Sequence, residues 1–137
     1  MKRIFKKKKL SSFSKSSFKI KKNIQGNVYK ILNKDSKIYH GFGELYITTL
    51  NINVSKGWIY HKKMTSNVFV VKGKVKFFLK NNNYTTKKIL SENRNEILTI
   101  KPKVWFKIVN LVNKTSKIIN FASLKHNPNE VIKKENL

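Results

Sequence analysis

Residues 56–79 read KGWIYHKKMTSNVFVVKGKVKFFL, and this stretch decides the fold class. One histidine, His61, comes just before a run of alternating apolar residues, and a single glycine, Gly73, stands in the middle of that run. Alternation with a period of two residues is typical of a β-strand with one buried face. The segments 67–71 and 74–79 are therefore predicted to be strands that flank a tight bend at Gly73, where glycine permits a positive φ.

The same pattern continues on both sides of this stretch. Segment 44–54, ELYITTLNINV, is rich in β-branched residues, and further short strands are expected at 86–90, 96–100, 104–111 and 116–123. No segment has sustained helical periodicity. Many short strands at regular spacing predict one all-β domain, an antiparallel barrel or sandwich, over residues 24–131. Residues 132–137 are predicted to be a C-terminal tail.

The first 23 residues consist mainly of lysine and serine, with only scattered apolar side chains. Such a segment is too charged to build a core, so residues 1–23 are predicted to be a basic, flexible arm. The positive start is not followed by the apolar core of a secretory signal, and no run reaches the roughly 18 apolar residues that span a bilayer. We therefore expect a cytoplasmic protein without membrane contact.

The formal net charge of +25 first points to a nucleic-acid partner. However, all but two of the 31 basic residues are lysine, and the exceptions are Arg3 and Arg94. Arginine is the usual reader of bases and phosphates because its fork binds them bidentately. Lysine, asparagine and isoleucine, all abundant here, also share A/T-rich codons. We interpret the charge as a solvated lysine surface and do not expect nucleic-acid binding, while steering of anionic ligands stays open.

Little of the chemistry that marks common enzyme classes is present. The 137 residues contain no cysteine, which excludes a disulfide framework, a thiolate zinc site and a cysteine nucleophile. There is no glycine-rich phosphate loop, and no two of the three histidines stand at metal-ligand spacing. From the residues alone, His61 is either a polar contact beside a strand or a catalytic group, and both readings stay open.

Several segments together resemble the cupin superfamily, and most closely dTDP-4-dehydrorhamnose 3,5-epimerase and related small sugar epimerases. The segments that carry the resemblance are HGFGELY (40–46), KGWIYHKKM (56–64), VVKGKVKFFL (70–79), IKPKVWFKIVNL (100–111) and HNPNE (126–130). Their order and spacing are more specific than any one of them. The resemblance implies an all-β jelly-roll barrel with a basic N-terminal arm.

The resemblance also bears on metal binding. Cupins that hold a metal use a His-x-His pair, a glutamate and a later histidine. These positions correspond here to Ile59, His61, Ser66 and Phe106, so one ligand of four remains. A single imidazole cannot hold zinc or iron, which take three or more protein ligands. We expect neither a metal nor another cofactor.

The resemblance implies acid–base chemistry next to a sugar ketone. The histidine base of the family falls on His61, and imidazole serves as a general base because histidine titrates near cellular pH. The family's lysine falls on Ser66, so Lys63 is the candidate replacement for stabilising the enolate. The family's tyrosine acid falls on His126, which can also donate a proton.

Other departures concern the groups around the base. The carboxylate that orients the family's histidine lies in a C-terminal region that this chain lacks, and Glu44 or Glu130 is the candidate replacement. Tyr60 should point away from His61, because adjacent strand residues face opposite sides. The predicted catalytic residues are His61, Lys63 and His126, and the predicted substrate-binding residues are His40, Glu44, Trp58, Ser66, Trp105 and Phe106.

Each of these assignments has a plainer alternative. The two tryptophans, with Tyr60 and Phe106, would line the barrel mouth for stacking on a sugar or base, but Trp58 and Trp105 could equally pack in a core or a dimer interface. His40 could be a turn residue and His126 a surface residue.

The sequence thus predicts an epimerase or isomerase of a nucleotide-linked 4-keto sugar, in cell-surface polysaccharide synthesis such as that of lipopolysaccharide. The expected ligand is a dTDP-sugar, and the expected assembly is a homodimer formed by strand exchange at the barrel edge, which would cover exposed edge strands. The alternative is a non-catalytic cupin that binds a sugar or nucleotide. A charge-driven binder of nucleic acid or membrane is the third possibility.

Overall fold

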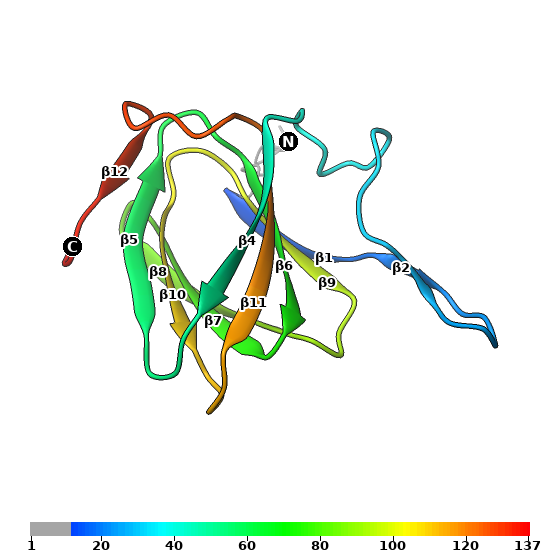
Figure 1. Ribbon diagram of the computed structural model, residues 1–137. Coiled ribbons are helices and arrows are strands. Elements are labelled where there is room, and N and C mark those ends of the chain that lie inside the picture. The colour runs from blue at the N-terminus through cyan, green and yellow to red at the C-terminus, as the bar shows by residue number, and fades with distance from the viewer. Residues whose placement is uncertain (1–11) are drawn as a thin grey trace, which may run out of the picture.

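The computed structural model describes residues 12–137, and every regular element in this part of the chain is a β-strand (Figure 1). The strands are β1 (Phe13–Ser17), β2 (Lys19–Lys21), β3 (Val28–Lys30), β4 (Glu44–Leu50), β5 (Ser55–His61), β6 (Ser66–Lys72), β7 (Lys74–Asn81), β8 (Tyr84–Ser91), β9 (Glu96–Ile100), β10 (Trp105–Asn110), β11 (Ser116–Ala122) and β12 (Val131–Lys133). The all-β architecture expected from the sequence is confirmed.

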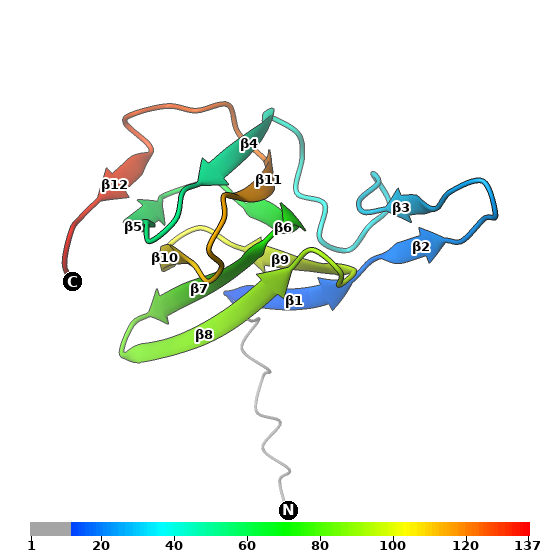
Figure 2. The same ribbon diagram turned by 60° about the horizontal axis from the view of Figure 1, so that its bottom comes forward.

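Two five-stranded antiparallel sheets face each other. Sheet I has the order β1-β9-β6-β11-β4, and sheet II has the order β12-β5-β10-β7-β8. Strands β2 and β3 form a separate hairpin that projects from the barrel (Figure 2). Because strands that follow one another along the chain often belong to opposite sheets, segments far apart in sequence become neighbours at the barrel ends.

The core lies between the two sheets and is filled by alternate residues of their strands. In β10, for example, Phe106 and Ile108 are buried while Trp105, Lys107 and Val109 are partly exposed. The buried apolar cluster consists of Leu50, Val68, Val70, Val75, Phe77, Leu79, Leu90, Leu98, Ile100, Val104, Phe106, Ile108 and Ile118. The period-two alternation of the sequence therefore selects which side chains form the core.

The predicted bend at Gly73 is present, and it moves the chain from one sheet to the other. Strand β6 belongs to sheet I and β7 to sheet II, so the two strands that flank Gly73 do not pair with each other. Gly73 has a φ of +90°. A Cβ atom there would lie 2.1 Å from Oγ of Ser116. Both the backbone conformation and the available space thus require glycine at this position.

The N-terminal segment differs from the flexible arm expected over residues 1–23. Strand β1 pairs with β9 along its whole length, and Phe13 packs against the core cluster. The ammonium group of Lys15 lies 2.8 Å from the carboxylate of Glu96, and the ring centroid of Phe18 lies 6.1 Å from that of Phe69. Edge pairing and spaced phenylalanines order a segment that composition alone marks as disordered. Residues 1–11 of the predicted arm lie outside the described residues.

The C-terminal segment also differs from the expected tail at 132–137. Strand β12 pairs with β5, so that Val131 lies opposite His61 and Lys133 opposite Ile59. Its three residues are too few for a periodicity signal, and only the unpaired edge of β5 makes a strand favourable there. The predicted strand at 44–54 ends early, at Leu50, because residues 51–54 form the turn to β5, where Asn53 adopts a φ of 59°.

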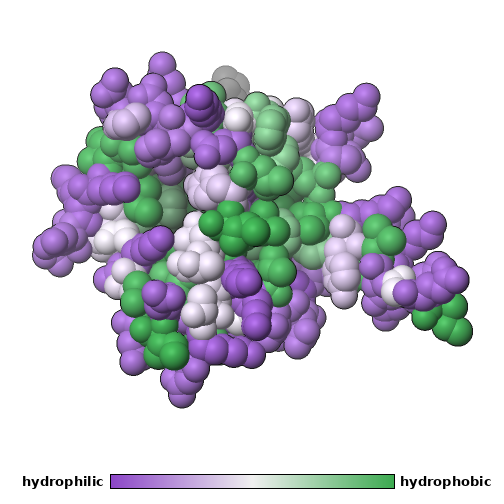
Figure 3. Space-filling view, viewed as in Figure 1, coloured by the Kyte–Doolittle hydropathy of each residue, from purple (hydrophilic) through white to green (hydrophobic). Residues whose placement is uncertain are grey.

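The outer face of sheet I carries several exposed apolar side chains. Leu45 and Ile47 on β4 are 58% and 63% exposed, and Val71 on β6 is 48% exposed. Phe42 packs against Phe121, with ring centroids 5.3 Å apart. Figure 3 shows hydrophobic residues gathered in the middle of this side of the molecule, in front of β4, β11 and β6.

We expect Gly73→Ala to destabilise the fold more than Gly41→Ala. The φ values, +90° and +93°, are nearly equal, but a Cβ atom at Gly41 meets nothing within 4 Å. Both variants carry the left-handed conformation at a cost of about 1–2 kcal/mol. Gly73→Ala should lose about a further 1–3 kcal/mol from overpacking against Ser116. Urea unfolding of both variants measures the difference, and equal losses would contradict this account.

Candidate active site

His61 is the last residue of β5 and points into the barrel. Its neighbour Ile59 packs against the core, whereas the ring of Tyr60 contacts Trp105 on the outer face, at a centroid distance of 4.9 Å. The His61 side chain is only 11% exposed. Its ring stacks on Phe106, with centroids 6.0 Å apart and an interplanar angle of 24°. Strand alternation and core packing together fix the ring inside the barrel.

A buried carboxylate lies directly beside this histidine. Oε1 of Glu130 is 2.7 Å from Nδ1 of His61. The other oxygen, Oε2, accepts hydrogen bonds from the backbone N–H groups of Lys63 at 3.0 Å and Met64 at 3.1 Å. Strand β12 places Glu130 there, because Val131 pairs with His61 and the N–H of Lys62 donates to the carbonyl of Glu130.

Glu130 is held in its charged form. Burial acts to raise the pKa of Glu130, but the hydrogen bonds from the Lys63 N–H, the His61 ring and the Met64 N–H, together with the charge of His61, lower it below the ordinary value of 4.5. A carboxylate at this position accepts the proton on Nδ1, which leaves the lone pair on Nε2. The pair is therefore arranged so that Nε2 of His61 can take a proton from a ligand in the barrel.

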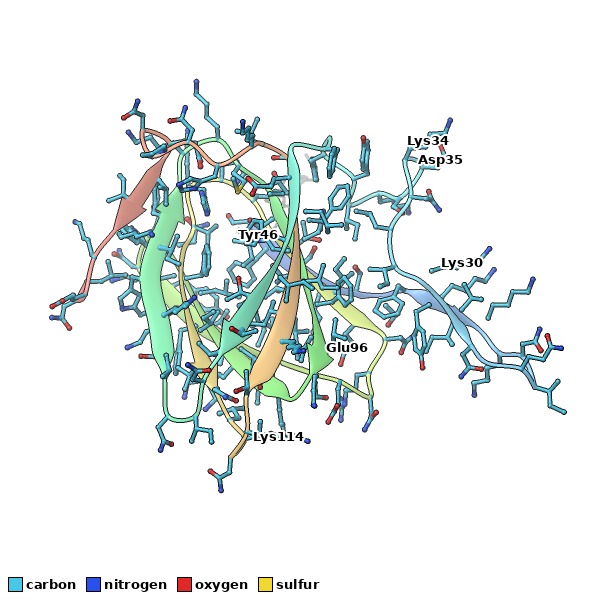
Figure 4. The ribbon with its side chains drawn as sticks, viewed as in Figure 1. Lys30, Lys34, Asp35, Tyr46, Glu96 and Lys114 are labelled. Carbon is cyan, nitrogen blue, oxygen red and sulfur yellow. The ribbon has the colours of Figure 1, made fainter. Side chains whose placement is uncertain are left out.

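Polar side chains on sheet I also face the interior. Tyr46 on β4 lies opposite Asn120 on β11, and Nδ2 of Asn120 donates a 2.7 Å hydrogen bond to the phenol oxygen. Burial raises the pKa of Tyr46, and the charges of Glu44 and Glu130 raise it further, against the effect of the Asn120 hydrogen bond. Tyr46 and the His61–Glu130 pair thus share one electrostatic environment, and Figure 4 shows Tyr46 between the two sheets.

Three buried polar atoms of sheet I make no hydrogen bond within residues 12–137. Oε1 of Glu96 still lies 3.7 Å from the guanidinium of Arg94, whereas Oγ of Ser66 and Oδ1 of Asn120 have no such charged neighbour. Buried polar groups are nearly always paired in folded proteins, so unpaired ones need an explanation. Ser66 and Asn120 have inward-facing positions on their strands, which Val68 and Ile118 of the core cluster share. Their free atoms fit a barrel interior that receives a polar ligand.

The structure brings some predicted residues to the interior and leaves others outside. His61, Ser66 and Phe106 face the barrel. The side chain of Lys63 is exposed, and only its backbone N–H serves the site. His126 is exposed, with its N–H bound to Oε1 of Glu44 at 2.9 Å. His40 is exposed too.

The expected aromatic lining of the barrel mouth is present only in part. Tyr60, as expected from alternation with His61, lies outside, and Trp105 pairs with it in register. Trp58 contacts Phe78 on the same outer face, with ring centroids 6.5 Å apart. Of the predicted aromatic set, only Phe106 lies inside.

Tyr46 is the interior residue that sequence reasoning missed. The sequence carried a signal for this inward position, because Tyr46 alternates along the strand with Leu50, which is fully buried. The same face of the strand also carries Glu44 and Thr48. Had the strand phase been taken from Leu50, the phenol would have been placed inside. Glu130 was one of two candidates for the orienting carboxylate, and the structure distinguishes it from Glu44, whose carboxylate binds the backbone of His126.

Residues 12–137 contain neither a cluster of metal-ligating side chains nor a helix that could span a membrane. No group of three or more histidine, aspartate and glutamate side chains there could hold a metal ion. The expectation of a metal-free protein stays a prediction. In the same range, no helix has the length and apolar character needed to cross a membrane.

We expect Glu130→Gln to lower stability in a pH-dependent way. Because folding lowers the pKa of Glu130 below 4.5, its contribution is fully present above that pH and is lost as the pH falls through the folded-state value. The loss of stability in the variant should be about 1–3 kcal/mol at neutral pH and should shrink below about pH 4. Urea unfolding across this range, with the exposed Glu135→Gln as control, measures it. A difference between Glu130→Gln and wild type that is independent of pH would contradict a charged Glu130.

Comparison with known proteins identifies the relatives of this chain. No curated protein sequence matches it. A dTDP sugar isomerase from Desulfovibrio desulfuricans G20 superposes with a TM-score of 0.82 at 21% identity, covering 89% of this chain and 83% of that one. The sugar 3,4-ketoisomerase QdtA from Thermoanaerobacterium thermosaccharolyticum, solved with TDP, gives 0.79 at 20% identity over 93% and 91%. The dTDP-4-dehydrorhamnose 3,5-epimerase from Sulfolobus tokodaii gives 0.77 at 15% identity over 89% and 76%.

These superpositions confirm the cupin jelly-roll fold that the sequence predicted. The family described as "FdtA: WxcM-like, C-terminal" matches residues 8–136, which is nearly the whole chain. The match includes β5 with His61 and β12 with the preceding Glu130. This protein therefore belongs to the FdtA family, of the WxcM-like C-terminal type.

Proposed function

We propose that this protein is an acid–base isomerase or epimerase of a nucleotide-linked 4-keto sugar, most simply a dTDP-sugar, working without a metal in cytoplasmic synthesis of cell-surface polysaccharide. The observation that carries the proposal is the 2.7 Å contact between His61 and the buried carboxylate of Glu130 inside the barrel. Similar barrels with this fold are dTDP-sugar isomerases and epimerases, which supports the substrate class.

The reaction begins with removal of a proton from C3, the carbon beside the C4 ketone. Nε2 of His61 takes this proton, and the C–H electron pair forms a C3–C4 double bond while the C4 oxygen becomes an enolate. Glu130 stabilises the imidazolium that results, because its charge faces Nδ1. Return of a proton to the other face of C3 inverts that centre. Return to C4, with loss of the proton on the C3 hydroxyl, moves the ketone from C4 to C3.

Tyr46 is suited to the second proton transfer. It stands on sheet I, across the interior from the base on sheet II, and its raised pKa keeps the phenol protonated. Asn120 donates to the phenol oxygen, so the phenol's own proton is free to be given to the substrate. Tyr46 therefore takes the proton-donating role that the sequence analysis assigned to His126. It also takes part of the enolate stabilisation that was assigned to Lys63.

A non-catalytic barrel that binds a sugar or nucleotide is less well supported. Such a protein needs no buried carboxylate against its histidine, since a binding contact does not require a fixed tautomer. Burying the charged carboxylate of Glu130, which is 7% exposed, is costly unless that charge is paired and hydrogen-bonded. Three hydrogen bonds converge on that carboxylate, and they orient His61 for proton transfer.

In heavy water, we expect the wild-type protein to exchange the C3 proton of dTDP-4-keto-6-deoxyglucose for deuterium. In His61→Ala, the rate of this exchange should fall by about 10²–10⁴-fold, which is the usual contribution of a general base. Proton NMR follows the C3, C4 and C5 signals and identifies the product. His126→Ala, which changes an exposed histidine, is the matched control and should retain exchange. Binding of the nucleotide sugar without any exchange in the wild type would reject the enzyme in favour of a binding module.

The same assay separates the two proton transfers. Tyr46→Phe removes the acid but leaves the base, so deuterium should still enter at C3 while formation of the inverted or isomerised product falls. Equal loss of exchange and of product in Tyr46→Phe would instead assign the phenol to substrate binding or to the first step.

We also propose that the protein is a homodimer that pairs through the outer face of sheet I and its edges. Support comes from Leu45, Ile47 and Val71, large apolar side chains that are between 48% and 63% exposed on this face. Contiguous apolar patches of this kind mark protein interfaces. At a net charge of +25, two copies repel each other over most of their surface, and an apolar face is where contact costs least.

Ile47→Glu should convert the dimer to a monomer, because it places a charge in the interface. Ile89→Glu is the matched control: Ile89 is 40% exposed on β8 of sheet II, and its variant should stay dimeric. Sedimentation equilibrium gives the mass of each. A monomeric wild type, or an Ile47→Glu variant that stays dimeric, would contradict the interface.

A further inference from the structure

The outer face of sheet II carries a second constellation that the acid–base site does not use. Trp105 on β10 lies between Tyr60 on β5 and Lys80 on β7 in the strand register, so the three side chains share one face. The rings of Tyr60 and Trp105 are 4.9 Å apart with an interplanar angle of 42°. The ammonium group of Lys134 lies 5.5 Å from the Trp105 ring centroid.

These side chains border a cavity of about 670 Å³. Tyr60 and Trp105 contribute aromatic surface, while Lys80, Lys103 and Lys134 contribute three ammonium groups. No aspartate or glutamate side chain of the described residues lines it. Sites for small molecules in proteins typically measure about 300–1,000 Å³, so the volume is sufficient for a ligand of nucleotide size.

The cavity is separate from the barrel interior. Tyr60 and His61 are consecutive on β5 and face opposite sides of sheet II, so the sheet itself stands between the two sites. The loop before β10 lies at the border, where the N–H of Lys103 donates to the carbonyl of His61 at 2.7 Å. A ligand on Trp105 therefore does not reach the Glu130 carboxylate.

We propose that this cavity binds a nucleoside phosphate, with the base stacked on the Trp105–Tyr60 pair and the phosphates between Lys80, Lys103 and Lys134. Aromatic rings stack on bases of any identity, and lysine ammonium groups attract phosphate as point charges. A neutral sugar would leave the lysines unused, and inorganic phosphate would leave the rings unused. The ligand is either a free nucleotide or the end of a single-stranded nucleic acid, since both present the same chemistry.

Fluorescence of Trp105 tests the proposal directly. The chain has two tryptophans, so Trp58→Phe leaves Trp105 as the only indole. In the full-length Trp58→Phe protein, titration with thymidine diphosphate or adenosine diphosphate should quench this fluorescence to saturation. Thymidine, which lacks phosphate, and pyrophosphate, which lacks a base, should each bind at least about tenfold more weakly, because stacking and charge both contribute. A 5′-phosphorylated dT oligomer that binds more tightly than the free nucleotide identifies nucleic acid as the source, and equal binding identifies the nucleotide.

Lysine variants locate the site. Lys80→Ala combined with Lys134→Ala should weaken binding of thymidine diphosphate about tenfold. Lys87→Ala is the matched control, because Lys87 is exposed on sheet II beside Phe78 and does not line the cavity. Unchanged affinity in the double variant, an equal loss in Lys87→Ala, or no quenching by either diphosphate would overturn the proposal.

A histidine variant separates this site from the acid–base site. In the Trp58→Phe background, His61→Ala should abolish C3 exchange and leave quenching of Trp105 unchanged. Loss of quenching in His61→Ala would assign the nucleotide to the barrel interior and overturn the second site. Quenching without exchange in the parent protein would reject the proposed enzyme activity and retain the outer site.

Discussion

The contact between His61 and Glu130 is the interaction on which the site depends. It joins two segments 69 residues apart in sequence, and it requires β5 and β12 to pair in the observed register. A shift of one residue would turn the carboxylate to the opposite face of the sheet. The backbone N–H groups of Lys63 and Met64 bind the second carboxylate oxygen, so the turn after β5 also determines where the charge lies. Fold and chemistry are thus linked through one buried carboxylate.

Much of the fold could be predicted from the sequence because the central strands repeat apolar residues with a period of two. Segments 67–71, 74–79, 96–100 and 116–123 all fall within or close to observed strands. The terminal strands could not be predicted in this way. β1 is rich in lysine and serine, and β12 has three residues, so both are stabilised by the edges with which they pair rather than by their own pattern.

The site could be predicted only around its histidine. From the residues alone, His61 was either a polar contact beside a strand or a catalytic group, and the resemblance gave it a role. The strand phase set by Leu50 could have placed Tyr46 inside, but its partnership with Asn120 exists only once β4 and β11 lie side by side. The two tryptophans show the reverse case. Their aromatic character pointed to the barrel mouth, but strand phase decides which face a side chain occupies, and both lie outside.

The shortness of β12 has a consequence for how activity relates to unfolding. This strand has three residues, lies at the edge of sheet II and contributes nothing to the central apolar cluster. Such elements open at lower free energy than the core, by local fraying rather than by global unfolding. Since Glu130 immediately precedes β12, detachment of that strand frees the histidine from its carboxylate while the barrel stays folded. Loss of activity and thermal unfolding of the barrel are then separate transitions, and activity is lost at the lower temperature.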